Sequence, residues 1–155
     1  MLIRPARRED FPAILRLLGD IAAFHAENRP DVFEAGYRKY DADELKIIAA
    51  NPDTPVFVAA EAGACLGYIF CAVREEKKHP PMRTRRVLYV DDLCVDSAHR
   101  RMGAATALLA AAEDFGKARG CASAELNVWR FNRPAISLYE RAGFSAQKQT
   151  MEKNL

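Results

Sequence analysis

The segment with the clearest potential for chemistry joins two adjacent carboxylates to a loop of arginines and small residues. Asp91 and Asp92 stand inside the otherwise apolar run 87–95, where burying a carboxylate costs free energy. Paired carboxylates can bind a cationic amine, and one of them can accept its proton directly or through water. The alternative is a structural pair that forms salt bridges with Arg85 or Arg86.

The loop that follows has the composition of a phosphate-binding site. Arg100 and Arg101 supply positive charge, and Gly103 keeps a side chain away from the backbone. A helix that begins here presents N–H groups without intrahelical partners at the positive end of its dipole. The sequence therefore predicts a pyrophosphate cradle over residues 100–106, with a plain helix start as the alternative. The pattern is neither a P-loop nor the dinucleotide motif G-x-G-x-x-G.

A second patterned block spans residues 127–144. From Asn132 onward it has the spacing N-x-x-A-x-x-x-Y-x-x-x-G-F. Together with R-x-x-G-x-A from Arg100 onward, this block resembles the GNAT superfamily of acetyl-CoA-dependent N-acetyltransferases. The resemblance is dense over residues 89–144, whereas residues 24–78 show no specific match.

The resemblance implies a cofactor role for individual residues. Backbone amides of the 100–106 loop would hold the pyrophosphate of acetyl-CoA. This loop consists of Arg100, Arg101, Met102, Gly103, Ala104, Ala105 and Thr106. Main-chain groups of Leu93 and Val95 would pair with the pantetheine arm, which would enter where the strands splay at Val95 and Asn127. Asn132 would hydrogen-bond the cofactor from the second block.

The resemblance also implies direct transfer of the acetyl group to an amine. Tyr139 would point its hydroxyl at the thioester sulfur and protonate the leaving thiolate as general acid. A phenol with a pKa of about 10 keeps its proton at neutral pH. The alternative is a core tyrosine on an amphipathic helix. The strand around Asp91 and Asp92 is similar to that of polyamine acetyltransferases, which supports a role of the pair toward a cationic amine.

The elements that must position these residues follow from hydrophobic periodicity. The expected strands are 2–5, 55–61, 65–73, 86–95, 122–128 and the terminal segment 144–155. The expected helices are 11–22, capped by Asp10, and 41–50, 102–119 and 132–141. The order β-α-α-β-β-β-α-β-α-β predicts an α/β fold, a single GNAT domain over 1–155 whose mixed, mostly antiparallel sheet is flanked by helices.

Composition excludes several other classes of protein. The chain has 155 residues, 50% hydrophobic and 28% charged, as is typical of one globular domain. Its net charge of +2 argues against a nucleic-acid partner, so the basic residues between 77 and 86 are expected to form a solvated loop. No apolar run approaches the ~18 residues of a membrane helix. Because the N-terminus is charged where a signal peptide is apolar, we expect a cytoplasmic protein without a membrane partner.

The four cysteines are expected to be free thiols in a reducing compartment, because none forms a C-x-x-C pair. Cys94 is expected to be structural, since direct transfer needs no covalent intermediate. The three histidines are scattered, so no metal site is expected.

The acceptor is expected to be the amine of a small molecule, with its pocket near residues 25–33 and with Trp129 and Phe131 beside the cofactor cleft. Two alternatives remain at this point: a protein or peptide N-terminal acetyltransferase, and a noncatalytic CoA-binding regulatory module. A homodimer is also expected, because the terminal segment 145–155 would form an exposed edge strand that invites pairing with another chain.

Overall fold

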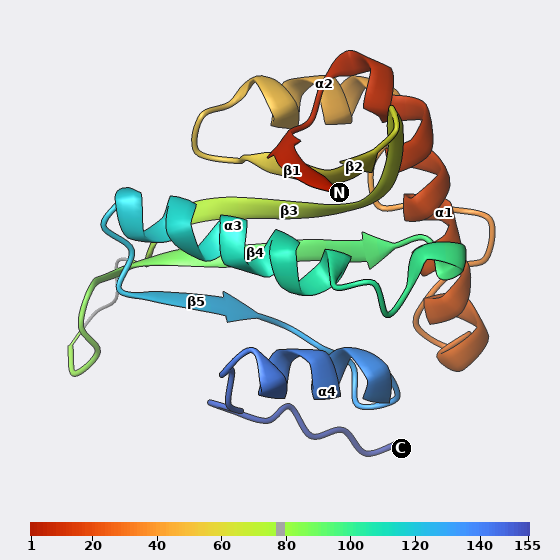
Figure 1. The fold of residues 1–155 in the computed structure, drawn as a ribbon. Coiled ribbons are helices and arrows are strands. Elements are labelled where there is room, and N and C mark those ends of the chain that lie inside the picture. The colour runs from red at the N-terminus through yellow and green to blue at the C-terminus, as the bar shows by residue number, and fades with distance from the viewer. Residues whose placement is uncertain (77–79) are drawn as a thin grey trace.

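Five strands form one sheet, in the order β1-β2-β3-β4-β5, in a computed structural model that describes residues 1–76 and 80–155 (Figure 1). Neighbouring strands are antiparallel, except that β4 and β5 are parallel. The expected mixed, mostly antiparallel sheet is therefore confirmed. The strands are β1 (Leu2–Pro5), β2 (Val56–Glu61), β3 (Ala64–Glu76), β4 (Arg85–Val95) and β5 (Ser123–Leu126).

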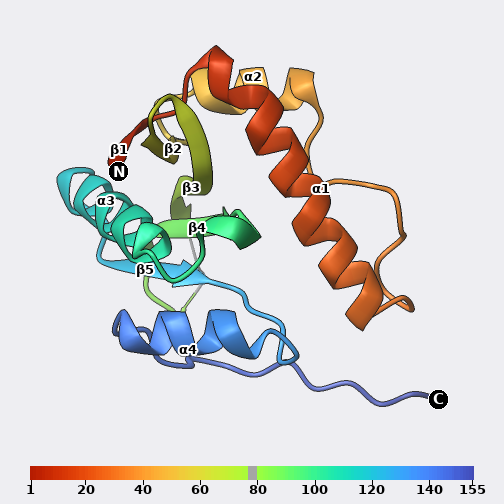
Figure 2. The same cartoon turned by 45° about the vertical axis from the view of Figure 1, so that its right-hand side comes forward.

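Four α-helices in the described residues flank the sheet. They are α1 (Phe11–Asn28), α2 (Ala42–Ala50), α3 (Ala104–Ala118) and α4 (Arg133–Arg141). Short 3-10 turns, η1 (Arg8–Asp10) and η2 (Ser97–His99), precede α1 and follow β4. Figure 2 shows α1 diverging from the sheet, so that its C-terminal end faces the loop between β5 and α4. The helix α4 lies beyond β5, at the end of the sheet opposite α2.

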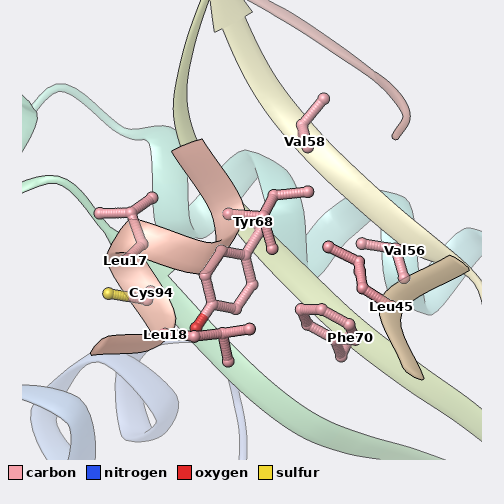
Figure 3. Packing of buried hydrophobic residues seen from close by; sticks show 9 residues of the cluster. Leu17, Leu18, Leu45, Val56, Val58, Tyr68, Phe70 and Cys94 are labelled. Carbon is pink, nitrogen blue, oxygen red and sulfur yellow. The ribbon is translucent and has the colours of Figure 1, made fainter. Parts of the chain in front are cut away.

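Two hydrophobic cores lie on the two faces of the sheet because β3 alternates its side chains between them. Tyr68 and Phe70 face α1 and α2, whereas Ile69 and Cys71 face α3. The core under α1 and α2 contains Ile14, Leu17, Leu18, Leu45, Val56, Val58, Tyr68, Phe70 and Cys94 (Figure 3). The core under α3 contains Ala59, Ile69, Cys71, Leu88, Val90, Ala104, Leu108, Leu109 and Ala112.

Asp10 does not cap α1 with its side chain, contrary to the expectation. Its buried carboxylate instead accepts hydrogen bonds from the Arg4 guanidinium at 2.6 and 2.9 Å and from the backbone N–H of Arg7 at 2.8 Å. The hydrogen bond from Arg4 lowers the pKa of Asp10 below its usual value, despite the opposing effect of burial. The pair thus fastens β1 to the start of α1.

The expected terminal strand 144–155 was wrong, because residues 145–155 have no regular secondary structure and pair with no strand in the described residues. The physical reason is that most of these side chains are polar, so that no apolar stripe can be buried on a sheet. Met151 is 87% exposed and Leu155 is fully exposed.

The expected basic loop is shorter than the sequence indicated. Arg85 and Arg86 belong to β4, and Arg83 is exposed as expected of a solvated residue. Lys77 and Lys78 lie outside the described residues. In the two described stretches of the chain, no helix has both the length and the apolarity to cross a bilayer.

Candidate functional site

The two aspartates lie at a β-bulge of β4. Phe70 of β3 pairs with Asp92 and Cys71 pairs with Val90, which leaves Asp91 as the extra residue between them. Such a bulge breaks the strict alternation of side chains along a strand. Asp92 shares the α1 side with Cys94 two residues further on, and Asp91 reaches groups on the same side of the sheet.

Asp91 is held by two residues of the segment between α1 and α2. The Tyr40 hydroxyl donates to Asp91 Oδ2 at 2.6 Å, and Lys39 Nζ lies 2.9 Å from the same oxygen. Lys39 also donates to the Asp91 carbonyl at 2.8 Å. Sequence reasoning missed Lys39 and Tyr40, because no motif marks them and about 50 residues separate them from the aspartates.

Arg85 and Arg86, the alternative partners considered for the two aspartates, bind other groups. Arg85 Nη2 lies 2.6 Å from Glu125 Oε1 and 3.7 Å from Glu76 Oε2. Arg86 donates to the backbone carbonyl of Arg119 at 3.2 Å. In the described residues, the ion pair of the two aspartates is therefore the one between Lys39 and Asp91.

Asp92 and Tyr139 are electrostatically coupled. Burial is the main reason why the pKa of Asp92 rises to about 6, and the neighbouring Asp91 adds to the effect while Lys39 opposes it. Burial also raises the pKa of Tyr139 to about 12, and the charge of Asp92 contributes. Asp92 comes from β4, and Tyr139 comes from α4 and packs against the core under α3.

The strands β4 and β5 pair only over part of their lengths. The ladder runs from Val87 with Ser123 to Val90 with Leu126, and β4 then continues to Val95. The edge of β4 over residues 91–95 therefore has no β5 partner. The backbone groups of Leu93 and Val95 lie in this segment, where β4 and β5 no longer pair.

The loop before α3 offers backbone donors. Arg101 and Gly103 have φ angles of 63° and 81°, and α3 begins at Ala104 without a side-chain cap. A Cβ added at Gly103 would meet no atom within 4 Å, so there is open space over the backbone there. Arg100 and Arg101 are exposed beside it, with Met102 and Thr106. Uncapped N–H groups next to two guanidinium groups form a donor set that suits an anion such as a pyrophosphate.

The asparagines of the second block have structural partners. Asn127 Nδ2 donates to the Tyr89 hydroxyl at 3.0 Å. Asn132 Oδ1 accepts from the backbone N–H of Ala135 at 3.2 Å and so caps α4, which begins one residue later. The Asn132 amide nitrogen is not used by this cap.

An aromatic cluster joins the C-terminal end of α1 to the loop between β5 and α4. It consists of Phe24, His25, Phe33, Trp129 and Phe131. The Phe131 ring lies 5.7 Å from Phe24 and 5.8 Å from His25, and Phe33 lies 5.3 Å from Trp129, as centroid distances. Burial and then the charge of Lys39 lower the pKa of His25. The charge of Lys39 thus influences His25 as well as the two aspartates.

Arg29 lies against the aromatic cluster. Its guanidinium carbon is 5.4 Å from the centre of the Trp129 ring, and its Nη atoms pair with Asp31 and Glu152 at 2.8 Å. Through Glu152, the terminal segment therefore contacts the region in which the acceptor pocket was expected.

The cysteines form no disulfide and are free thiols. Burial raises the pKa of Cys94 to about 12, so this thiol carries a proton at neutral pH and is a poor nucleophile. The described residues contain no group of three or more His, Cys, Asp or Glu side chains that could hold a metal ion.

The profile of the acetyltransferase (GNAT) family matches residues 20–144, and the chain belongs to that family. The uncharacterized N-acetyltransferase YhfO of Bacillus subtilis (strain 168) is 27% identical over 144 residues, which are 93% of this chain and 89% of YhfO. A crystal structure of a mutant BH1408 protein from Bacillus halodurans is 28% identical and has a TM-score of 0.95, over 100% of this chain and 99% of that chain.

More distant structures share the fold. One of them is AAC(6')-Iy in complex with the bisubstrate analog CoA-S-monomethyl-acetylneamine, at 16% identity and a TM-score of 0.75, over 99% of this chain and 97% of that chain.

Proposed function

We propose that this chain is an acetyl-CoA-dependent N-acetyltransferase that acts on the amine of a small molecule. The observation that carries the proposal is the edge of β4 over residues 91–95, which has no β5 partner, carries Asp92 and leads to the uncapped start of α3. Asp92, with a pKa raised to about 6, can exchange a proton near neutral pH, whereas Tyr139, with a pKa raised to about 12, keeps its proton there. Membership of the GNAT family supports the transferase class.

Acetyl-CoA, when bound, supplies the thioester whose carbonyl carbon the amine attacks. The N–H groups of Ala104, Ala105 and Thr106, with Arg100 and Arg101, would hold its pyrophosphate. The free edge of β4 at Leu93 and Val95 would pair with the pantetheine arm, next to Asn127 and the unused amide nitrogen of Asn132. The open space over Gly103 and the lack of a side-chain cap on α3 support this assignment.

Proton transfer gives Asp92 and Tyr139 distinct roles. Asp92 would accept the proton of the acceptor ammonium group, which must become neutral before it can attack. Tyr139 would donate its proton to the leaving sulfur and regain one from solvent. Asp92 is ionised above a pH of about 6 and Tyr139 is protonated below a pH of about 12, so both groups are in the working state at neutral pH.

The acceptor would be a cation in solution. The charge of Asp91 is compensated by Lys39, so the negative charge left for an ammonium group is that of Asp92. The aromatic cluster includes His25 and Phe33, which come from the region expected to hold the acceptor, and it would line the acceptor pocket. The structural likeness to an enzyme bound to a CoA–aminoglycoside adduct supports a small cationic amine.

A thiol-release assay tests the proposed function. The chain is mixed with acetyl-CoA and a panel of amines that includes a polyamine, an aminoglycoside, an aromatic amine and a short peptide. Release of CoA with one small amine, and acetylation of that amine by mass spectrometry, is the expected result. CoA binding without thiol release from any acceptor would indicate a regulatory module, and release with the peptide alone would indicate a protein N-terminal acetyltransferase.

We also propose that the chain is a homodimer in the cytoplasm. The outer edge of β5 has no strand partner in the described residues, and residues 145–155 are exposed without regular secondary structure. They begin beside a hollow lined by Phe144, Ser145, Gln147 and Ala124 of β5. An open edge next to an unpaired segment favours pairing with a second copy. The free thiols suit a reducing compartment.

A further inference from the structure

Tyr68 carries a hydroxyl that the fold does not satisfy. The residue is 0% exposed, and its hydroxyl forms no hydrogen bond within the described part of the chain. Its ring lies in the core under α1, 5.0 Å from Phe70 in an edge-to-face arrangement (Figure 3). Because an unpaired buried hydroxyl costs about 1–3 kcal/mol, phenylalanine would pack here at lower cost. Packing alone therefore does not account for a tyrosine at this position.

The strand register places Tyr68 next to the acidic pair. Tyr68 of β3 lies opposite Cys94 of β4, and Phe70 lies opposite Asp92. Tyr68 and Asp92 are therefore diagonal neighbours on the same face of the sheet, a relationship that separates backbones by about 7–8 Å and is within reach of a long aromatic side chain. The bulge lies beyond this pair, between Phe70 and Cys71, so it does not disturb the register of Tyr68.

We propose that Tyr68 is a positioning residue whose hydroxyl, without a partner in this structure, donates a hydrogen bond to the Asp92 carboxylate in the working enzyme and holds it toward the acceptor amine. This inference rests on the proposed function, because it assigns a task to the base of that reaction. The neutral donor stabilises the ionised form of Asp92 and fixes the orientation of its two oxygens.

The electrostatics of the two groups agree with this arrangement. Burial, followed by the charge of Asp92, raises the pKa of Tyr68 well above its usual value, so the hydroxyl keeps the proton that it donates. Tyr68 in turn lowers the pKa of Asp92, against the larger effect of burial.

The other groups around Asp92 are committed elsewhere. Lys39 and Tyr40, from the segment before α2, bind Asp91. On β4, the Asp91 carboxylate pairs with Lys39, and the buried Cys94 thiol is protonated at neutral pH. On α4, Tyr139 is the proton donor to the leaving sulfur in the proposed reaction. Tyr68 is thus the neutral donor that β3 contributes.

The test is the Tyr68→Phe variant, which removes the hydroxyl and keeps the ring. The side-chain carboxyl of Asp92 is titrated by carbon-13 NMR, and kcat/KM for the best amine is measured from pH 5 to 9. Without the donor, the titration midpoint and the acid limb of the rate profile should both move up by about 0.5–1 pH unit. The value of kcat/KM at pH 6 should fall several-fold and should recover largely at pH 9.

Tyr37→Phe is the matched control, because it removes the same hydroxyl from a side chain that is 67% exposed. It should leave the Asp92 titration and the pH profile of kcat/KM unchanged. The inference is overturned if the Asp92 midpoint is the same in Tyr68→Phe and in the parent chain, whatever happens to stability. A moved midpoint in a chain that acetylates no amine would support the hydrogen bond and contradict the proposed function instead. The NMR titration needs no activity, so the two failures can be told apart.

Discussion

The Tyr40 hydroxyl donates a 2.6 Å hydrogen bond to the Asp91 carboxylate, and this contact gives Asp91 a different environment from the adjacent Asp92. Lys39 adds a charge to the same oxygen at 2.9 Å. Asp91 thereby anchors the segment before α2 to β4. Asp92 is left with a charge that burial makes costly, which is the property expected of a group that binds a cation and accepts its proton.

The two aspartates should therefore respond differently to substitution. Asp92→Asn should lower kcat/KM for the best amine by about 10²–10⁴ and remove the acid limb near pH 6, because the amide cannot accept a proton. Asp91→Asn should weaken the Lys39 and Tyr40 anchor and act mainly on KM. Steady-state kinetics of both variants across pH measures this. Unchanged kcat/KM in both would mean that the pair is structural and that residues 25–33 recognise the acceptor.

Tyr139→Phe should lower kcat by about 10²–10⁴ while the affinity for CoA stays nearly the same, because the change removes a proton donor and little volume. Rates are measured at saturating acetyl-CoA, and CoA affinity is measured by calorimetry. Phe144 packs edge-to-face on the Tyr139 ring at 5.8 Å, so Phe144→Leu serves as a packing control that keeps the hydroxyl. An unchanged kcat in Tyr139→Phe would mean that water or another group protonates the thiolate, or that chemistry is not rate-limiting.

Gly103→Val should lower CoA affinity by about tenfold or more, because the branched side chain would fill the space over the loop backbone. The φ of 81° at Gly103 also makes any side chain strained, by about 1–2 kcal/mol. Gly63 provides a matched control, since it has a φ of 82° and open space in the turn between β2 and β3. Gly63→Val should cost similar stability and leave CoA affinity intact. Equal affinities of the two variants in calorimetry would contradict the assignment of the loop.

Local sequence patterns were sufficient to predict the elements that carry the site. The strand expected over 86–95 is observed as Arg85–Val95, and the helix expected over 132–141 is Arg133–Arg141. Both elements could be predicted because hydrophobic periodicity, a glycine at a helix start and an asparagine cap are local signals. Each depends only on residues close to it in the sequence. The resemblance to the GNAT superfamily rested on the same local motifs.

Features that depend on distant partners could not be predicted. The direction of the two aspartates depends on the bulge, which is fixed by the register of β4 against β3. The Tyr40 and Lys39 contacts join segments about 50 residues apart without a motif. Asp10 sits at a helix start, but Arg4 competes successfully for its carboxylate. The terminal strand was wrong because residues 145–155 are mostly polar, so they have no apolar stripe to bury against a neighbouring strand.

The homodimer should depend on the terminal segment. Light scattering at micromolar concentration should give twice the mass of the 17.3 kDa chain. A chain that ends at Phe144 should be monomeric, because it lacks the segment proposed to pair with the β5 edge of the other copy. The double variant Met151→Ser and Leu155→Ser, which changes two exposed apolar side chains, keeps the segment and tests its apolar contacts. A monomeric mass for the intact chain would reject the dimer.

The two buried carboxylates should affect stability in opposite directions as pH changes. Asp10 has a pKa below its usual value, so its ionised form stabilises the fold above the ordinary pKa of 3.8 and this stabilisation is lost as pH falls through the lowered value. Asp92 has a pKa raised from 3.8 to about 6, so the folded chain is favoured when Asp92 is protonated, and this part of its stability is lost as pH rises from about 3.8 to about 6.

Asp10→Asn should therefore lower the free energy of unfolding at pH 8 by about 3–5 kcal/mol, because the Arg4 guanidinium loses its ionic partner in a buried site. Asp92→Asn should instead raise the free energy of unfolding at pH 8 by about 1–3 kcal/mol and raise it by less at pH 4.5, because an amide has no charge to desolvate. Urea unfolding of both variants and the parent chain at the two pH values measures this. If Asp92→Asn is as destabilised at pH 8 as Asp10→Asn, then the Asp92 carboxylate is a paired structural anion and cannot be the base.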